Sequence, residues 1–286
     1  MKDIIIFFET IPSSWRAAFL IGGLALFWSL ESIVPLIKFS YHKWKHAGIN
    51  IFFTLTTVLI NLAFASLLYL SSQWAVNHSF GIVQWLQLPL WAEAILGLLL
   101  LDLIGAYLIH YLEHRVRWMW RFHIIHHSDP YVDTTTANRH HPIESVFRAT
   151  FTILAVLIAG TPMWLVMLYQ SLSVLFSQFN HANIRLPKKV DKWLSYLIVS
   201  PNMHKVHHHY RLPLTDTNYG NIFSIWDRLF GTYAFCPPQK LHYGIDTHPK
   251  EEEHSRILRL LSIPFEAYRS ASPPETPEKR EEKAKA

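Results

Sequence analysis

The chain has 286 residues, of which 50% are hydrophobic and only 16% are charged. Charged residues make up about a quarter of an ordinary soluble domain, so this deficit indicates a membrane protein. The formal net charge of +5 is modest, and the basic residues lie in loops between apolar runs, where they orient a membrane protein and do not indicate nucleic-acid binding. Cys236 is the single cysteine, which excludes an internal disulfide and a thiolate metal cluster. Any bound metal must therefore use nitrogen and oxygen ligands.

Three apolar segments near the N-terminus predict transmembrane helices. They cover residues 16–37, 49–71 and 89–109, and each is long enough to cross about 30 Å of hydrocarbon. The N-terminus lacks a basic region and a small-residue cleavage site, so we do not expect a removable signal peptide. We assign residues 1–109 to an N-terminal transmembrane region.

The charges of the loops predict the orientation of these spans. The loop after the first span contains Lys38, Lys43 and Lys45, whereas the 72–88 loop has no Lys or Arg. Basic loops stay in the cytoplasm, so the first loop is predicted to be cytoplasmic. The third span then returns to the cytoplasmic side.

A further apolar segment, residues 149–180, is interrupted at Gly160 and Pro162. One span here would place the histidines before it and those after it on opposite sides of the membrane. Two shorter helices that turn at the interruption avoid this, so we predict a membrane hairpin that need not cross fully. The fold class is therefore all-α, an integral membrane bundle of three spans plus a hairpin with a cytoplasmic, histidine-rich helical cap. The Pro-, Glu- and Lys-rich residues 273–286 predict a disordered charged tail.

The histidines are concentrated in one part of the chain. Twelve of the 18 lie between residues 110 and 209, and three clusters stand out. These clusters are His110 and His114; His123, His126 and His127; and His204, His207 and His208. Spacings of three and four place rings on one helical face, and the adjacent third histidine of each larger cluster lies about 100° further round, where it could reach a second ion.

The number of histidines favours two ions, because eight ligands exceed the six positions of one octahedral ion. Imidazole suits zinc, copper, iron and nickel. Zinc cannot change its oxidation state, whereas iron can, and two irons can activate dioxygen to attack an unreactive C–H bond. Two alternatives stay open. His110 and His114 also fit the inverted zinc-protease pattern H-x-x-E-H with Glu113 as base, which would make the protein a zinc-dependent membrane hydrolase. The second alternative is a metal-binding transporter or sensor that catalyses no reaction.

Four segments of the chain resemble the fatty acid hydroxylase superfamily, which includes sterol desaturases and sterol methyl oxidases. They are DLIGAYLIHYLEHRVRWMWRFHIIHHSDP (102–130), DTTTANRHHPIE (133–144), FNHANIRLP (179–187) and SPNMHKVHHHYRLPLTDTNYGNIFSIWDRLFGTY (200–233). The resemblance implies a metal-binding region at residues 110–272, with a binuclear iron centre that uses molecular oxygen to hydroxylate or desaturate a lipid. It also implies that zinc can occupy the centre in isolated protein.

The resemblance also implies the ligands. By position they are His110, His114, His123, His126, His127, His181, His204, His207 and His208. His141 is an additional candidate, whereas His140 and His209 depart from the family pattern and are left out. No further catalytic residue is predicted.

Three polar residues near the clusters have two interpretations each. Asn183 could bind a metal through water or cap a helix. Asp216 and Asn218 could orient the imidazoles by hydrogen bonds, or could simply build a turn with Gly220.

The sequence contains no haem motif, dinucleotide fingerprint or cysteine cluster, so electrons are expected from a separate reductase, ferredoxin or cytochrome. The compact layout suggests a bacterial plasma-membrane enzyme. The lipid substrate stays open among sterols, fatty acyl chains and related lipids.

Overall fold

The computed structural model describes residues 2–270, and within them every regular element longer than a single bridge is a helix. Two isolated bridges pair Pro35 with Ile184 and Ile198 with Phe223. The all-α prediction is confirmed. The predicted tail at 273–286 lies outside the described residues.

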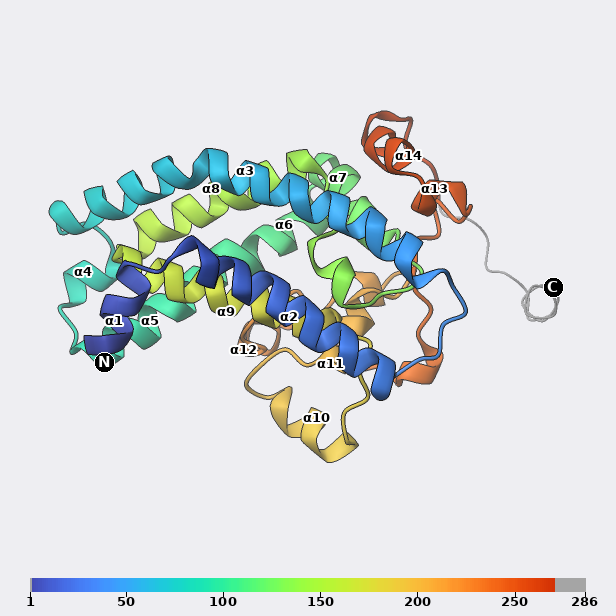
Figure 1. Cartoon of the computed structure of the whole chain (residues 1–286), viewed down its shortest axis with the longest axis horizontal. Coiled ribbons are helices and arrows are strands. Elements are labelled where there is room, and N and C mark those ends of the chain that lie inside the picture. Colours follow the sequence, from blue (N-terminus) through green and yellow to red (C-terminus); the bar gives the residue numbers. More distant parts are fainter. Residues whose placement is uncertain (1, 271–286) are drawn as a thin grey trace.

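Long helices run side by side along the molecule (Figure 1). They are α2 (Ser13–Ile33), α3 (Lys43–Asn77), the continuous α5 (Leu90–Asp102), η1 (Leu103–Leu108) and α6 (Ile109–Arg115), and the pair α8 (Pro142–Ala159) and α9 (Met163–His181). Shorter helices are α1 (Lys2–Glu9), α4 (Ile82–Leu86), α7 (Arg117–His127), η2 (Thr134–Asn138), α10 (Lys188–Leu194), α11 (Pro201–His207), η3 (Leu214–Asp216), α12 (Ile225–Leu229), η4 (Pro238–Lys240), α13 (Glu252–Ser255), α14 (Ile257–Ser262) and η5 (Ile263–Phe265).

Within residues 2–270, four helical segments are long and apolar enough to cross a membrane. Three of them correspond to the predicted spans, with bounds of Ser13–Ile33, Lys43–Leu86 and Leu90–Arg115. The fourth is α8, Pro142–Ala159. The third span therefore continues six residues beyond the predicted end at 109, so that the first histidine pair belongs to the spanning helix itself.

The hairpin of α8 and α9 covers residues 142–181, whereas the sequence predicted a hairpin at 149–180. Its turn lies at the opposite end of the bundle from the histidines (Figure 1). At its turn, the Gly160 carbonyl accepts a hydrogen bond from Gln84 (2.8 Å), and the Thr161 carbonyl accepts one from Ser72 (2.8 Å). Gly160 has φ +73°, and a Cβ on it would lie 2.4 Å from the Phe80 carbonyl oxygen, so the turn requires glycine. We call this end, with the 78–89 loop and the 160–162 turn, the far end.

The helices pack through apolar side chains and leave an apolar outer surface. Leu101, Val156 and Val166 are fully buried in a core between α3, α5, α8 and α9. On the outer face of α3, Leu59 and Leu62 are 64% and 70% exposed. Such a surface suits hydrocarbon and not water.

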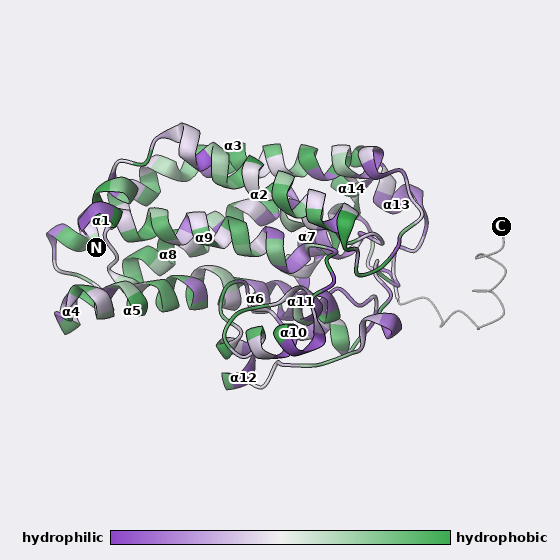
Figure 2. Cartoon of the chain, turned by 60° about the horizontal axis from the view of Figure 1, so that its bottom comes forward, coloured by the Kyte–Doolittle hydropathy of each residue, from purple (hydrophilic) through white to green (hydrophobic). Residues whose placement is uncertain are grey.

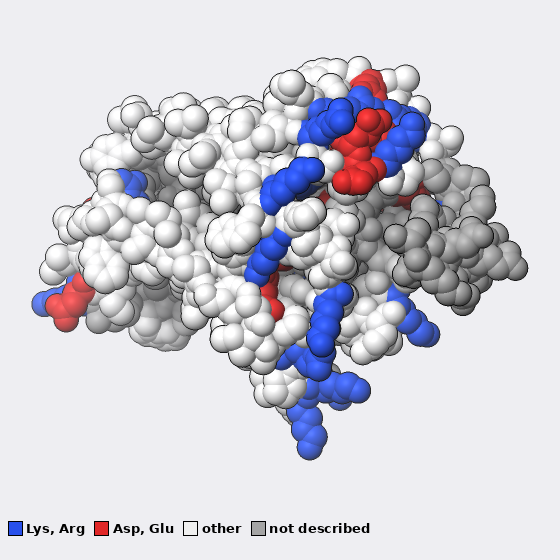
Figure 3. All heavy atoms as spheres, turned by 45° about the vertical axis from the view of Figure 1, so that its right-hand side comes forward, with Lys and Arg blue, Asp and Glu red and all other residues white. Residues whose placement is uncertain are grey.

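Hydrophilic residues gather at the other end, around α10, α11 and α13 (Figure 2). On the face in Figure 3, Lys and Arg are concentrated at this end, whereas most of the bundle surface carries no charge. The ends of α2, α6 and α9 and the starts of α3 and α8 all lie here, and we call it the site end. The basic loop around Lys43 is therefore on the same side as the histidines, as predicted.

One turn of the third span is a π-helix, η1. A π-helical turn accommodates one residue more than an α-helical turn. The buried positions reflect this: the buried pair Leu101 and Asp102 is followed five positions later by the buried pair Ala106 and Tyr107, and then three positions later by Ile109 and His110. The π-helical turn thus sets which face of α6 points into the protein.

Candidate metal centre

The site end brings nine histidines from four helices together. α6 carries His110 and His114, α7 carries His123, His126 and His127, α9 ends at His181, and α11 carries His204 and His207 with His208 directly after it. All nine side chains are buried. These are the nine predicted ligands, and the structure places all of them in two adjoining groups.

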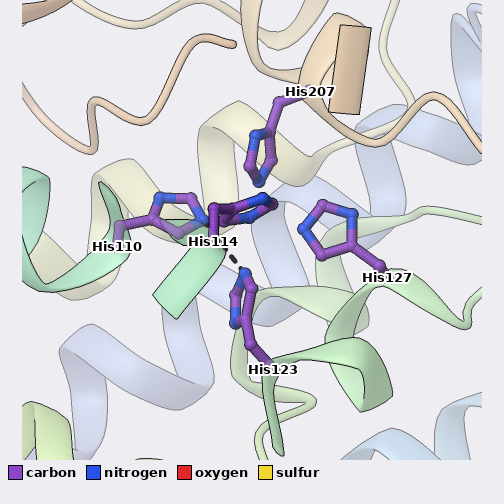
Figure 4. A group of neighbouring side chains, drawn as sticks. All are labelled: His110, His114, His123, His127 and His207. Carbon is purple, nitrogen blue, oxygen red and sulfur yellow. Dashed lines mark hydrogen bonds between the residues drawn. The ribbon is translucent and has the colours of Figure 1, made fainter. Parts of the chain in front are cut away.

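The first group, the five-histidine group, consists of His110, His114, His123, His127 and His207 (Figure 4). The second, the four-histidine group, consists of His126, His181, His204 and His208. Within each group, one nitrogen per ring lies within 4.8 Å of one from every other ring. The rings of His127 and His208 stack with centroids 4.9 Å apart, which joins the groups.

Each H-x-x-H-H cluster is divided between the groups in a way that differs from the prediction. His123 and His127 share one group while the middle member, His126, belongs to the other. In the last cluster His204 and His208 stay together and the middle member, His207, crosses over. From the helical spacing, the third histidine of each cluster, His127 or His208, was instead expected to reach the second ion. Residues four apart are offset by only about 40° on a helix, against about 60° for residues three apart, so the pair at spacing four is better aligned.

The nitrogen positions fit bound cations. His110 Nδ1 lies 2.8 Å from the Tyr219 carbonyl oxygen, which can only accept, so its Nε2 carries a lone pair. This Nε2 lies 3.2 Å from His123 Nε2, whose Nδ1 is bonded to a carboxylate. Two lone pairs do not attract, but two nitrogens about 2.1 Å from one ion lie about 3.0–3.4 Å apart in octahedral or tetrahedral geometry.

The same argument applies to the four-histidine group. His181 Nδ1 lies 2.7 Å from the Ser177 carbonyl oxygen, which leaves Nε2 as an acceptor. Both His126 Nε2 and His204 Nε2 lie 3.1 Å from it. One acceptor cannot satisfy both rings, whereas one cation could bind all three nitrogens.

Burial keeps the histidines neutral, which is the form that binds metal. It lowers the pKa of His123, His126 and His127 well below the ordinary value, and the neighbouring histidines lower it further. The pKa values of His204, His207 and His208 are lowered for the same two reasons.

The loop at residues 216–219 orients three rings of the five-histidine group. Asp216 Oδ1 lies 3.1 Å from His114 Nδ1, which corresponds to the first of the two interpretations of this carboxylate, orientation of an imidazole. The carbonyls of Thr217 and Tyr219 accept from His207 (2.7 Å) and His110. Backbone carbonyls give no sequence signal, so these two contacts could not be predicted.

A buried carboxylate that the sequence analysis did not assign to the site orients the fourth ring. Glu144 Oε1 lies 2.7 Å from His123 Nδ1 and accepts from Arg148 Nε at 3.1 Å. Arg148 also binds Glu113 at 2.5 Å. One feature of the sequence could have identified Glu144: it lies four residues before Arg148 in an otherwise apolar helix. Charged residues within a membrane helix are usually functional.

This network weakens the zinc-protease interpretation. In that motif the glutamate must be available as a base beside a metal-bound water. Here Glu113 is paired with Arg148, and His110 and His114 share their group with three more histidines.

The remaining candidates lie outside both groups. His141 caps α8, its Nδ1 accepting from the Ile143 amide (3.1 Å). The Asn183 side chain accepts a hydrogen bond from the Ile37 amide (3.1 Å) and donates one to the Ile37 carbonyl (2.7 Å). Asn218 has φ +54° and bonds the backbone of Met203 and Ala234, which is the turn-building role. His140, which was left out, has its ring 4.9 Å from that of His126.

Buried polar contacts tie the membrane helices to the loops that carry the histidines. His46 Nε2 on α3 lies 2.8 Å from both carboxylate oxygens of Asp129. Arg139 is fully buried and donates to Asn50 and to the Ile125 carbonyl. Burial alone would raise the pKa of Asp129, but the His46 ring and hydrogen bonds hold it below the ordinary value, so the carboxylate is ionised.

Glu31 makes a similar connection from α2. Its Oε1 accepts from the amides of Thr134 and Asn183, both at 2.7 Å. The one acidic residue inside the first predicted span therefore fixes two loops of the site end.

The apolar helices and the buried histidine centre define a helical membrane protein with the donor set of a metal site. Comparison with known families makes this specific: residues 94–232 match the family model described as fatty acid hydroxylase. The chain belongs to the fatty acid hydroxylase superfamily. The resemblance stated from the histidine clusters is thus confirmed.

Curated relatives are lipid-oxidising enzymes by name. Ornithine lipid hydroxylase OlsE of Rhizobium tropici is 28% identical over 160 residues, which are 56% of this chain and 47% of that protein. Alkylglycerol monooxygenase of Danio rerio is 30% identical over 190 residues, 66% of this chain and 40% of that protein. Cholesterol 25-hydroxylase-like protein 1, member 2, of Danio rerio is 27% identical over 192 residues, 59% of this chain and 67% of that protein.

The chain thus spans less than half the length of the first two relatives. The search of solved structures found no significant match.

Proposed function

We propose that the protein is an integral membrane, oxygen-dependent lipid hydroxylase or desaturase whose two histidine groups each hold one iron ion. The observation that carries the proposal is the pair of buried, all-histidine groups at the end of a membrane bundle. With iron bound, such a centre supplies the chemistry that inserts one oxygen atom of O2 into a C–H bond and releases the other as water, using two electrons and two protons.

The chain's own residues hold and shield this centre. Asp216, Glu144 and the carbonyls of Thr217 and Tyr219 fix the rings, and the apolar bundle excludes water from them. An alkyl or acyl chain would approach from the bilayer, because the histidines of α6 continue directly from a spanning helix. The relatives named for ornithine lipid, alkylglycerol and cholesterol support a lipid as the substrate class.

The location follows from the same features. Basic residues gather at the site end, so this end is proposed to face the cytoplasm. The bacterial relative is consistent with a bacterial plasma membrane. Electrons would come from a separate reductase, ferredoxin or cytochrome.

The test is a comparison of lipid extracts from cells with and without the gene, by mass spectrometry. A lipid that gains the mass of one oxygen, or loses two hydrogens, only when the gene is present supports the proposal and names the substrate. The purified protein should hold two irons per chain and should consume oxygen only with that lipid and a reductant. Zinc alone with no oxygen requirement would instead support the hydrolase alternative, and metal binding without any lipid change would support a non-catalytic protein.

A further inference from the structure

The two histidine groups are anchored very differently by the surrounding protein. In the five-histidine group, four rings have Nδ1 bonded to a fixed acceptor. These pairs are His110 with Tyr219, His114 with Asp216, His123 with Glu144, and His207 with Thr217. Two of these acceptors are carboxylates.

Among residues 2–270, His181 is the one member of the four-histidine group whose ring makes a hydrogen bond of normal geometry to a fixed acceptor, the Ser177 carbonyl. The Asn218 backbone lies near the His204 ring without forming such a bond. The Nδ1 atoms of His126 and His204 are buried without a hydrogen-bond partner among the described residues, and so are both ring nitrogens of His208. Within residues 2–270, no carboxylate lies within hydrogen-bond or ion-pair distance of a ring nitrogen of this group.

Anchoring of this kind changes how strongly a ring holds a cation. A partner on Nδ1 fixes the tautomer and the ring orientation, so that Nε2 is already directed at the ion, and a carboxylate partner also makes the imidazole more basic. A ring without a partner must lose its rotational freedom when the ion binds. The five-histidine group therefore has more ligands, better oriented ligands and more basic ligands.

Glu144 is the strongest of the four anchors. It is fully buried, its hydrogen bond to His123 is 2.7 Å long, and Arg148 holds it from the other side. Asp216 is 24% exposed, is 3.1 Å from His114 and is shared with Arg115 at 3.5 Å. A buried, fixed carboxylate interacts more strongly than one that water can screen.

We propose that the two metal positions are unequal: the five-histidine group retains its ion, the four-histidine group releases its ion first, and Glu144 is the positioning residue that contributes most to the difference. The inference rests on the two-metal centre of the proposed function, and it assigns to Glu144 a role in metal retention that is independent of the lipid oxidised.

The experiment follows metal loss from the full-length chain, purified in detergent and loaded with iron, after addition of a chelator. Samples are desalted at intervals, and iron per chain is measured by elemental analysis. The expected result is two phases of one equivalent each. His204→Ala should remove the fast equivalent and leave the slow one, which assigns the fast phase to the four-histidine group.

Glu144→Gln should accelerate the slow phase about 10- to 100-fold, the usual effect of removing a partner of a ligating histidine, and leave the fast phase unchanged. Glu252→Gln, an exposed carboxylate outside the site, is the matched control and should change neither phase. If Glu144→Gln does not fold, Asp216→Asn, at a partly exposed position, should accelerate the slow phase by a smaller factor.

Loss of both equivalents at one rate would overturn the proposal, as would equal acceleration of both phases by Glu144→Gln, or no acceleration of the slow phase by the variant that folds. A chain that binds a single ion would overturn both this inference and the two-metal centre. Ordered loss of two ions without any oxygen-dependent lipid oxidation would contradict the proposed function and leave this inference standing.

Discussion

At the far end of the bundle, the helices are joined by a close backbone contact between Gly81 and Gly160 and by two hydrogen bonds to turn carbonyls. At the site end, the same helices are joined by buried charges such as Asp129, Arg139 and Glu31, each with several partners. Burying charge is costly unless every charge is paired. The contacts at the far end therefore stabilise the fold alone. At the site end, the free energy cost of burying charge is offset by contacts that also hold the histidine-bearing loops in place.

The largest effect should come from removing a histidine at the site end. His207→Ala deletes one ligand of the five-histidine group, so lipid oxidation should fall to background and iron should fall from about two to about one per chain. Product formation and elemental analysis measure the two effects. His209→Ala, two residues further on and outside both groups, is the control. Full activity in His207→Ala would contradict the assignment of the groups.

The next largest effect should come from the buried charges. Asp129→Asn removes the carboxylate that lies 2.8 Å from the His46 ring and leaves Asp133, at 3.4 Å, as its partner. Removing one partner of a buried ion pair costs about 3–5 kcal/mol. We expect a clear loss of thermal stability in detergent, measured by tryptophan fluorescence, with Glu252→Gln unchanged. A stability equal to that of the parent chain would mean that this network is not what holds α3 to the site end.

A smaller effect is expected at the far end. Gly160→Ala forces a side chain into a left-handed conformation and against the Phe80 carbonyl, which should cost about 1–3 kcal/mol. Iron per folded chain should stay at the parent value, because the site end is untouched. Gly22→Ala is the matched control, since a Cβ there meets nothing within 4 Å. Loss of iron from folded Gly160→Ala protein would show that the two ends are coupled.

The smallest effect should be that of mild acid. An exposed histidine site loses metal as pH falls through about 6.5, because protonated imidazole cannot bind. The pKa values of His123, His127 and His207 are lowered well below that value by burial, so these rings stay neutral. Iron content after equilibration at about pH 6 should therefore match that at neutral pH. Release of both ions at that pH would show that the rings protonate as exposed histidines do.

Much of this architecture could be predicted from the sequence, because it depends on periodicity and composition. Long apolar runs gave the spans, and the spacing of the histidines gave the ligand-bearing helices. The hairpin was predicted because His114 and His204 must lie on the same side of the membrane to share a site. The nine predicted ligands are the nine histidines that the structure gathers.

Other features depend on three-dimensional contacts and have no local signal. The division of each cluster between the two groups follows from small differences in helical phase, and the carbonyls of Thr217 and Tyr219 could belong to any residue type. Glu144 could not be assigned to the site from the sequence, because its contact with His123 joins two helices that the sequence does not place relative to each other.

The π-helical turn at Leu103–Leu108 determines the direction of the first two histidines of the centre. The extra residue of a π-helical turn rotates everything after it by about 100° relative to an uninterrupted α-helix. His110 and His114 both lie beyond this turn, so a single-residue deletion within it would rotate both imidazoles away from their partners while leaving every ligand in the sequence. The geometry of this metal centre therefore depends on the number of residues in one turn of a membrane helix as much as on the histidines themselves.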